Sequence, residues 1–304
     1  MRGLGIGKSL VTQFLLVGHP VGHSVSPSIH FAAYKALGRS DAHYSVLDCP
    51  TEADVRRVFE RLRSGELAGA NVTVPHKTLA LSLADRVDTS ARDVGAANVL
   101  ACMRGEIVAY NTDAPALAEE LLELIPTPSS GALIVGSGGA ALAAAVSAKL
   151  AGFAPILVTA RRFSIGEDPR GWPLSDVFAE RGVEACPWPL DGPDQSPQAL
   201  LERVEMVIQA TSAGMKGTDS GEMLTAFVGT GRDRAYYDLV YNPPLTPFLR
   251  AAEERGARAR GGLGMLVRQA ARAIEIWLGE RPALEPLFAA AEQALGLPPR
   301  AAKS

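Results

Sequence analysis

Short apolar runs alternate with amphipathic stretches through the first third of the chain, in the order expected for strands and helices of an α/β fold. Ser26-Pro27 is a favourable helix start, with Ser26 as N-cap, and Gly38 is a helix stop. Arg104-Gly105 between two apolar runs indicates a hairpin turn. The predicted strands are 12–17, 44–47, 70–74, 98–103 and 106–110, and the predicted helices are 27–37, 52–63 and 77–84.

The Pro/Ser cluster at 126–130 follows a predicted helix over 115–124 and marks the start of a second unit. The continuous apolar run 132–135 is typical of a strand that is buried on both faces. A long Ala-rich helix to Leu150 comes next. Further strands are predicted over 156–159, 206–210 and 235–238, and further helices over 263–278 and 284–295. This series is typical of a doubly wound dinucleotide-binding domain.

The composition favours a small-molecule partner over nucleic acid or a membrane. The 304 residues suit two domains, and a net charge of -3 gives no electrostatic reason to expect a polyanion or a lipid surface. Cys49, Cys102 and Cys186 form no CxxC pair, and His19 and His23 lie among Gly and Pro and share no helix face. We therefore expect no metal site, and a cytoplasmic protein with reduced cysteines.

The segment from Gly136 to Ala141 lies between a predicted strand and a predicted helix. Its glycines allow a tight turn and close approach to a pyrophosphate, which the N–H groups and dipole of the helix N-terminus then hold. Ala141 replaces the usual third Gly. The predicted cofactor contacts here are Gly136, Ser137, Gly138, Gly139 and Ala140.

The end of the next predicted strand indicates which dinucleotide binds. NAD sites place an acidic residue there to bond the ribose 2′-OH, whereas this chain has Arg161 and Arg162. Guanidinium groups suit a 2′-phosphate, so NADP is favoured. The alternative is that both arginines are solvated surface residues.

Four polar clusters in the first domain suit substrate chemistry. Ser24 and Ser26 at a helix N-terminus can hold a carboxylate, although Ser26 can equally serve as a cap alone. Strand alternation puts Thr73 on the same face as Asn71, and Asn98 has an amide for hydroxyl groups. Lys77 follows a Pro-constrained turn and is either a reactive group or a solvated one, and Asp113 is either its partner or a helix cap.

Taken together, these segments resemble the shikimate dehydrogenase family from about Phe14 to Leu295. The motifs that carry the resemblance occur in order as GHPVGHSVSPSIH, GANVTVPHK, GAANVL, YNTD, GSGGA, ATSAGM, YDLVYNPPLTPFL and GGLGMLVRQAA. The family reduces 3-dehydroshikimate to shikimate reversibly with NADPH, in aromatic amino-acid biosynthesis. The resemblance implies a cytoplasmic oxidoreductase, either a monomer or a homodimer.

The resemblance also assigns roles to individual residues. Lys77 matches the catalytic lysine and Asp113 its partner. Ser24, Ser26 and Tyr241 match residues that hold the substrate carboxylate, Thr73, Asn98 and Gln269 match residues that bind ring hydroxyls, and Leu239, Gly262 and Met265 match positions near the cofactor. It implies a discontinuous substrate domain, 1–113 and 264–304, an inserted Rossmann-like NADP domain, 114–263, and a cleft between them.

The implied chemistry is hydride transfer to a carbonyl carbon while the oxygen gains a proton. The Lys77 ammonium can donate that proton and stabilise the developing charge, with Asp113 orienting it. Pairing with a carboxylate raises the pKa of a lysine and desolvation lowers it, and the sequence does not decide between the two.

This chain departs from the family pattern at several positions. Val25 stands where many members have Lys, Ala114 where Gly is common and His76 where Phe is common. Ile165 stands where a second phosphate-binding Arg is typical, and Arg162 can replace that residue. Two alternatives remain open: an NAD-using quinate/shikimate dehydrogenase, and a catalytically silent nucleotide-binding regulator. The intact catalytic and substrate set argues against the regulator.

Overall fold

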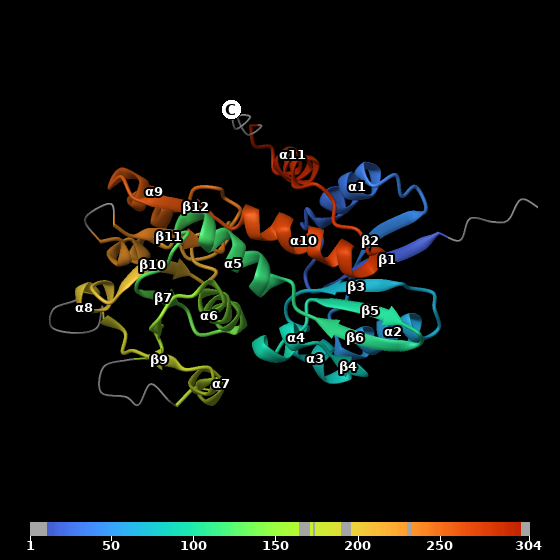
Figure 1. Cartoon of the computed structure of the whole chain (residues 1–304), viewed down its shortest axis with the longest axis horizontal. Coiled ribbons are helices and arrows are strands. Elements are labelled where there is room, and N and C mark those ends of the chain that lie inside the picture. The colour runs from blue at the N-terminus through green and yellow to red at the C-terminus, as the bar shows by residue number, and fades with distance from the viewer. Residues whose placement is uncertain (1–10, 164–170, 173, 190–195, 230–232, 299–304) are drawn as a thin grey trace, which may run out of the picture. The chain divides into compact units, whose positions relative to one another are not determined.

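The computed structural model describes residues 11–163, 171–172, 174–189, 196–229 and 233–298 (Figure 1). The chain forms two compact units: one contains the residues up to Thr112 together with those from Ala270 onward, and the other contains Asp113–Gln269. The sequence predicts that the chain passes from the first unit to the second after residue 113 and returns after residue 263. Among the described residues no helix is long and apolar enough to span a membrane.

The first unit contains a mixed sheet in the order β2-β1-β3-β5-β6-β4. Strand β1 is parallel to β2 and β3, and β5 is antiparallel to β3 and β6. The strands are β1 (Thr12–Gly18), β2 (Ala42–Asp48), β3 (Gly69–Val72), β4 (Arg86–Val87), β5 (Val99–Met103) and β6 (Glu106–Tyr110). The helices are α1 (Ser26–Ala36), α2 (Glu52–Arg63), α3 (Lys77–Leu83), α4 (Thr89–Val94) and α11 (Leu284–Ala294).

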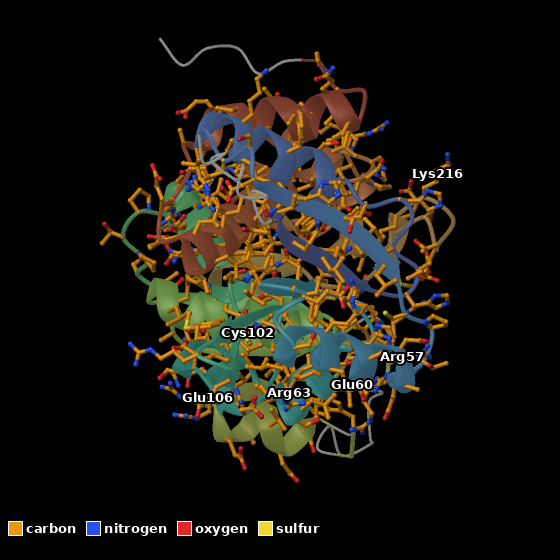
Figure 2. The ribbon with its side chains drawn as sticks, turned by 90° about the vertical axis from the view of Figure 1, so that its right-hand side faces the viewer. Arg57, Glu60, Arg63, Cys102, Glu106 and Lys216 are labelled. Atoms are coloured by element: carbon orange, nitrogen blue, oxygen red, sulfur yellow. The ribbon has the colours of Figure 1, made fainter. Side chains whose placement is uncertain are left out.

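Local sequence explains several of these elements. Thr51 and Asp54 form a capping box at the start of α2, with each side chain bonded to the backbone N–H of the other residue. Arg104 and Gly105 have positive φ, 54° and 85°, as a two-residue hairpin turn requires. Helix α2 buries its apolar stripe, whereas Arg57, Glu60 and Arg63 lie on its outer face (Figure 2).

Helix α10 (Leu263–Leu278) begins in the second unit, and its residues from Ala270 onward belong to the first unit. The second half of α10 therefore packs in the core of the first unit. Trp277 stacks on Phe14 with ring centroids 4.6 Å apart and donates its indole N–H to the Leu100 carbonyl at 3.0 Å. A Cβ at Gly69 would lie 2.3 Å from the Trp277 nitrogen. Glycine at this position therefore lets the indole lie directly on the sheet.

The second unit contains a sheet of six parallel strands in the order β12-β11-β10-β7-β8-β9. Its strands are β7 (Gly131–Val135), β8 (Ile156–Thr159), β9 (Val183–Ala185), β10 (Val204–Gln209), β11 (Ala235–Asp238) and β12 (Arg258–Gly261). Its helices are α5 (Asp113–Leu124), α6 (Gly139–Ala151), α7 (Ser175–Glu180), α8 (Gln198–Leu201) and α9 (Pro247–Glu254), with a 3₁₀ helix, η2 (Glu222–Phe227).

Both faces of this second sheet are covered by apolar groups. Residues of α5 and α6 pack with one face of β7, β8 and β10, and residues of α9 and η2 pack with the other. This arrangement confirms the predicted doubly wound α/β fold. No sequence pattern predicts β9 and β12, because both are short and rich in charged or small residues.

Candidate active site

Four segments of the first unit meet at one edge of its sheet. Thr73 donates its backbone N–H to the Val17 carbonyl at 2.8 Å, so the loops after β1 and β3 start side by side. Val72 donates to the Asn98 carbonyl at 2.9 Å, and Asn98 donates to Tyr110 at 3.0 Å. The start of β5 and the end of β6 therefore lie at the same edge, as expected for a ligand site in an open α/β sheet.

Ser24 and Ser26 form a hydroxyl pair at the N-terminus of α1. The Ser24 hydroxyl donates to the Ser26 hydroxyl at 3.1 Å and accepts from the Ser26 backbone N–H at 3.2 Å. The prediction that Ser26 is the N-cap is wrong, because Val25 is the N-cap and no side chain caps the helix. The helix begins one residue earlier because the Val25 carbonyl already accepts the first helical bonds. Both hydroxyls thus lie where a helix dipole favours an anion.

Thr73 lies in a turn and not in a strand. The predicted strand over 70–74 ends at Val72, since the Thr73 carbonyl accepts from the His76 N–H at 3.0 Å and closes a tight turn. The shared strand face predicted for Asn71 and Thr73 is therefore wrong. The Asn71 side chain is buried and bonds the Tyr44 hydroxyl at 2.7 Å.

Lys77 is the first residue of α3 and is half-buried. Its carbonyl accepts from the Ala97 N–H at 3.0 Å. The preceding His76 is buried and its Nε2 bonds the Cys49 carbonyl at 2.6 Å. The turn that carries Lys77 is thereby held on both sides, by the Ala97 backbone and by the His76 ring.

Asn98 is buried and bonded to Thr112 from both ends of its amide. Its Nδ2 donates to the Thr112 hydroxyl at 3.0 Å, and its Oδ1 accepts from the Thr112 N–H at 2.8 Å. Asp113 follows as the first residue of α5 and is only 7% exposed. The amide therefore fixes the chain immediately before the predicted partner of Lys77.

Tyr241 and Gln269 belong to the second unit. Tyr241 is half-buried in the loop after β11, and burial raises the pKa of its phenol, which stays a neutral donor near neutral pH. Gln269 on α10 is half-buried and donates to the Leu266 carbonyl at 2.8 Å.

Asp238 supports the loop that carries Tyr241. Its carboxylate accepts from the Val240 N–H at 2.9 Å and from the Thr246 hydroxyl at 2.6 Å. Burial raises the pKa of Asp238 to about 6, because desolvation outweighs these two bonds.

The glycine loop follows β7 and leads into α6. A Cβ at Gly136 would lie 2.8 Å from the Ala210 carbonyl oxygen, and its φ of +139° also requires glycine. Gly138 is the N-cap of α6 and supplies no side-chain acceptor, and a Cβ at Gly138 or Gly139 would meet open space. Together with the exposed Ala140, these residues form an open helix N-terminus that suits a phosphate.

A cavity of about 1050 Å³ lies between α1 and α11, and a smaller one of about 270 Å³ lies in the second unit at the glycine loop. The smaller cavity, here called the cofactor pocket, includes Gly136, Ser137, Arg161 and Arg162. The two guanidinium groups fit a 2′-phosphate and the glycine loop fits a pyrophosphate, so the residues present suit NADP. Ile165 lies outside the described residues.

Several lining residues of the cofactor pocket carry no sequence signal, among them Trp188 and Asp219. Asp219 Oδ2 accepts from Arg161 Nη1 at 3.4 Å. No motif marks Asp219, since its approach to Arg161 joins the loops after β10 and β8 and depends on the sheet order.

Leu239, Gly262 and Met265 come together at the ends of β11 and β12. A Cβ at Gly262 would lie 2.3 Å from the Leu239 carbonyl oxygen. Leu239 and Met265 both pack against the apolar core on the α6 side of the sheet. These three predicted contacts lie outside the cofactor pocket.

Comparison with known proteins identifies the family. Sequence profiles of the shikimate dehydrogenase substrate binding domain and of the shikimate 5′-dehydrogenase C-terminal domain match residues 16–100 and 262–292. A shikimate dehydrogenase (NADP⁺) from Methanopyrus kandleri is 36% identical over 273 residues, which cover 89% of this chain and 91% of that protein.

Solved structures agree. The shikimate 5-dehydrogenase of Thermus thermophilus, in complex with NADP(H) and shikimate, matches with a TM-score of 0.76, 31% identity, and coverage of 93% of this chain and 100% of that one. The Listeria monocytogenes enzyme, in complex with shikimate and NAD, matches with a TM-score of 0.79, 26% identity, and coverage of 91% and 95%. Because the Methanopyrus relative is 36% identical over 89% of this chain, the protein belongs to the shikimate dehydrogenase family.

Proposed function

We propose that the protein catalyses the reversible NADPH-dependent reduction of 3-dehydroshikimate to shikimate. The observation that carries the proposal is the sheet edge of the first unit, which gathers the serine pair, Thr73, Lys77 and Asn98. Family membership supports the same reaction, and the reaction belongs to aromatic amino-acid biosynthesis.

The substrate side of the proposal follows from the chemistry of this edge. The Ser24 and Ser26 hydroxyls at the α1 N-terminus hold the carboxylate, and Tyr241 adds a phenol donor. Thr73, Asn98 and Gln269 bond the ring hydroxyls, and the buried amide of Asn98 has its orientation set by Thr112.

Lys77 and Asp113 carry the proton chemistry. The Lys77 ammonium donates a proton to the carbonyl oxygen during reduction and stabilises the charge that develops there. Asp113 orients the ammonium, and in the reverse direction the pair takes the proton back.

Cofactor binding is assigned to the second unit. The glycine loop, Gly136 to Ala140, holds the pyrophosphate, and Arg161 and Arg162 hold the 2′-phosphate. Leu239, Gly262 and Met265 contact the nicotinamide end. NADPH supplies the hydride when bound.

The two units have separate proposed roles. The unit of β1–β6 is the substrate domain and the unit of β7–β12 the NADP domain, with boundaries near residues 113 and 263. We further propose a cytoplasmic monomer or homodimer, and the buried, free thiols of Cys49 and Cys186 agree with a reducing compartment.

NAD use is the alternative that a specific observation favours. The Asp219 carboxylate lies beside Arg161 in the cofactor pocket, and the structure of the Listeria relative contains NAD. Quinate stays open as a second substrate, because its extra hydroxyl needs only room in the pocket.

Steady-state oxidation of shikimate and of quinate, each with NADP⁺ and with NAD⁺, tests the proposal. Fast turnover of shikimate with NADP⁺ supports it. A preference for NAD⁺ or for quinate would move the protein to another branch of the family. Absence of turnover with every pair would overturn the proposed activity and favour a silent nucleotide-binding regulator.

A further inference from the structure

Within the cofactor pocket, Arg161 faces a carboxylate, that of Asp219. Arg161 and Arg162 follow β8, whereas Asp219 lies in the loop after β10, and β7 with its glycine loop stands between these two strands. Arg161 Nη1 and Asp219 Oδ2 are 3.4 Å apart, so this ion pair bridges the two sides of the pocket.

Asp219 is the anchored member of the pair. Its Oδ1 accepts from the Gly221 N–H at 3.0 Å, and its carbonyl accepts from the Gly214 N–H at 2.7 Å. Thr218 ties the same loop to the Ser212 carbonyl at 2.6 Å. Arg161, in contrast, has a side chain that is 64% exposed and its contact to Asp219 is long. The arginine is therefore the member that moves when a ligand enters.

The charges in the pocket oppose one another. Two guanidinium groups attract a 2′-phosphate of about -1.5 to -2 charges, but the Asp219 carboxylate repels it and occupies Arg161. A 2′-hydroxyl is neutral and can donate a hydrogen bond to a carboxylate. The acidic residue of NAD sites accepts this bond. Here the acidic residue comes from the loop after β10 and not from the end of β8.

We propose that Asp219 is a specificity-determining residue that weakens NADP binding and narrows the preference of this protein for NADP over NAD. It acts by restraining Arg161, by repelling the 2′-phosphate and by accepting a bond from a 2′-hydroxyl. This inference rests on the proposed function only in placing the adenosine ribose in the cofactor pocket.

The test measures dissociation constants by calorimetry for NADP⁺, NAD⁺, 2′,5′-ADP and 5′-AMP, with the full-length protein. Asp219→Asn removes the charge and keeps an oxygen for the Gly221 N–H. We expect NADP⁺ and 2′,5′-ADP to bind about threefold to tenfold more tightly, and NAD⁺ and 5′-AMP to bind equally well or more weakly. The gain shrinks at high salt, because the groups are exposed.

Three further variants make the result specific. Asp176→Asn, on the exposed face of α7, changes the net charge equally and leaves the preference unchanged. Asp219→Ser, which keeps a short acceptor, replaces Asp219→Asn if the latter unfolds. In an Arg161→Ala background, Asp219→Asn gives a smaller gain in NADP⁺ affinity, because Asp219 then has no Arg161 to restrain and weakens NADP⁺ binding only by repelling the 2′-phosphate.

An unchanged ratio of NADP⁺ to NAD⁺ affinity in a folded Asp219 variant would overturn the inference and leave the proposed function intact. Failure of the unaltered protein to bind any of the four nucleotides would overturn both. Tight 2′,5′-ADP binding without turnover of shikimate would overturn the proposed activity alone.

Discussion

Asn98 donates to the Thr112 hydroxyl at 3.0 Å and accepts from the Thr112 backbone N–H at 2.8 Å. Both residues are buried, and the next residue in the chain is Asp113. One amide thereby fixes the chain at the start of α5.

Thr112→Val tests this relationship. The variant keeps the backbone bond but leaves the Asn98 NH₂ without its hydroxyl acceptor, so we expect it to lose about 1 to 3 kcal/mol of stability. Urea unfolding measures the loss. Thr127→Val, at an exposed threonine, is the control and should change stability by less than about 0.5 kcal/mol. Equal stability of both variants would contradict the importance of the bond.

Lys77→Ala tests the proposed proton donor. We expect kcat for shikimate oxidation to fall by about 10² to 10⁴, because general acid–base catalysis contributes on that order. NADP⁺ affinity should stay unchanged, since the proposed cofactor contacts belong to the unit Asp113–Gln269 and Lys77 does not. Lys35→Ala, at an exposed lysine of α1, should keep full activity. Unchanged turnover in Lys77→Ala would exclude the proposed mechanism.

Asp238 should make the protein less stable as pH rises through the acidic range. The pKa of its carboxyl is about 6 in the folded chain and 3.8 as an ordinary value, so the unfolded chain ionises first. The contribution of Asp238 to the free energy of unfolding therefore falls by on the order of 3 kcal/mol between pH 3.8 and 6 and is level above that. Unfolding free energies from about pH 4 to 8 for the protein and for Asp238→Asn measure the difference. A difference independent of pH would refute the assignment.

Burial of His30 should make the protein less stable as pH falls, which is the opposite of the effect of Asp238. Its ring is fully buried and stacks on Tyr44 with centroids 3.7 Å apart, and burial lowers its pKa to about 3. The unfolded chain takes up a proton first, so stability falls as pH drops from 6.5 towards 3, by on the order of 5 kcal/mol. His30→Phe keeps an aromatic ring and should remove this dependence. Parallel stability curves for both proteins would count against it.

Gly262→Ala tests a close backbone approach. The added Cβ would lie 2.3 Å from the Leu239 carbonyl oxygen, so we expect a loss of more than about 2 kcal/mol and weaker NADP⁺ binding. Gly139→Ala is the contrasting variant, since its Cβ meets open space at the start of α6. Thermal melts should show it as stable as the unaltered protein or more so. Equal losses in both would argue against the steric explanation.

Much of the fold was predictable because its signals are local. Thr51 caps α2 through neighbours within three residues, and Arg104-Gly105 needs only its own backbone angles to form the hairpin. The glycine loop was predictable for the same reason, since the order of strand, glycines and helix is contiguous in sequence. The start of α1 was wrong by one residue, because the choice between Val25 and Ser26 as cap depends on which carbonyl accepts the first helical bonds.

The sequence by itself determined the α/β class, the glycine loop, the pair of arginines and the chemistry that Lys77 and the serines can perform, because these depend on residue type and short spacing. Only the tertiary structure decided which loops share a sheet edge, that Thr73 lies in a turn, and that Asp219 meets Arg161. Strand order sets these relationships, and strand order is fixed by packing between residues far apart in the chain, which no local pattern records.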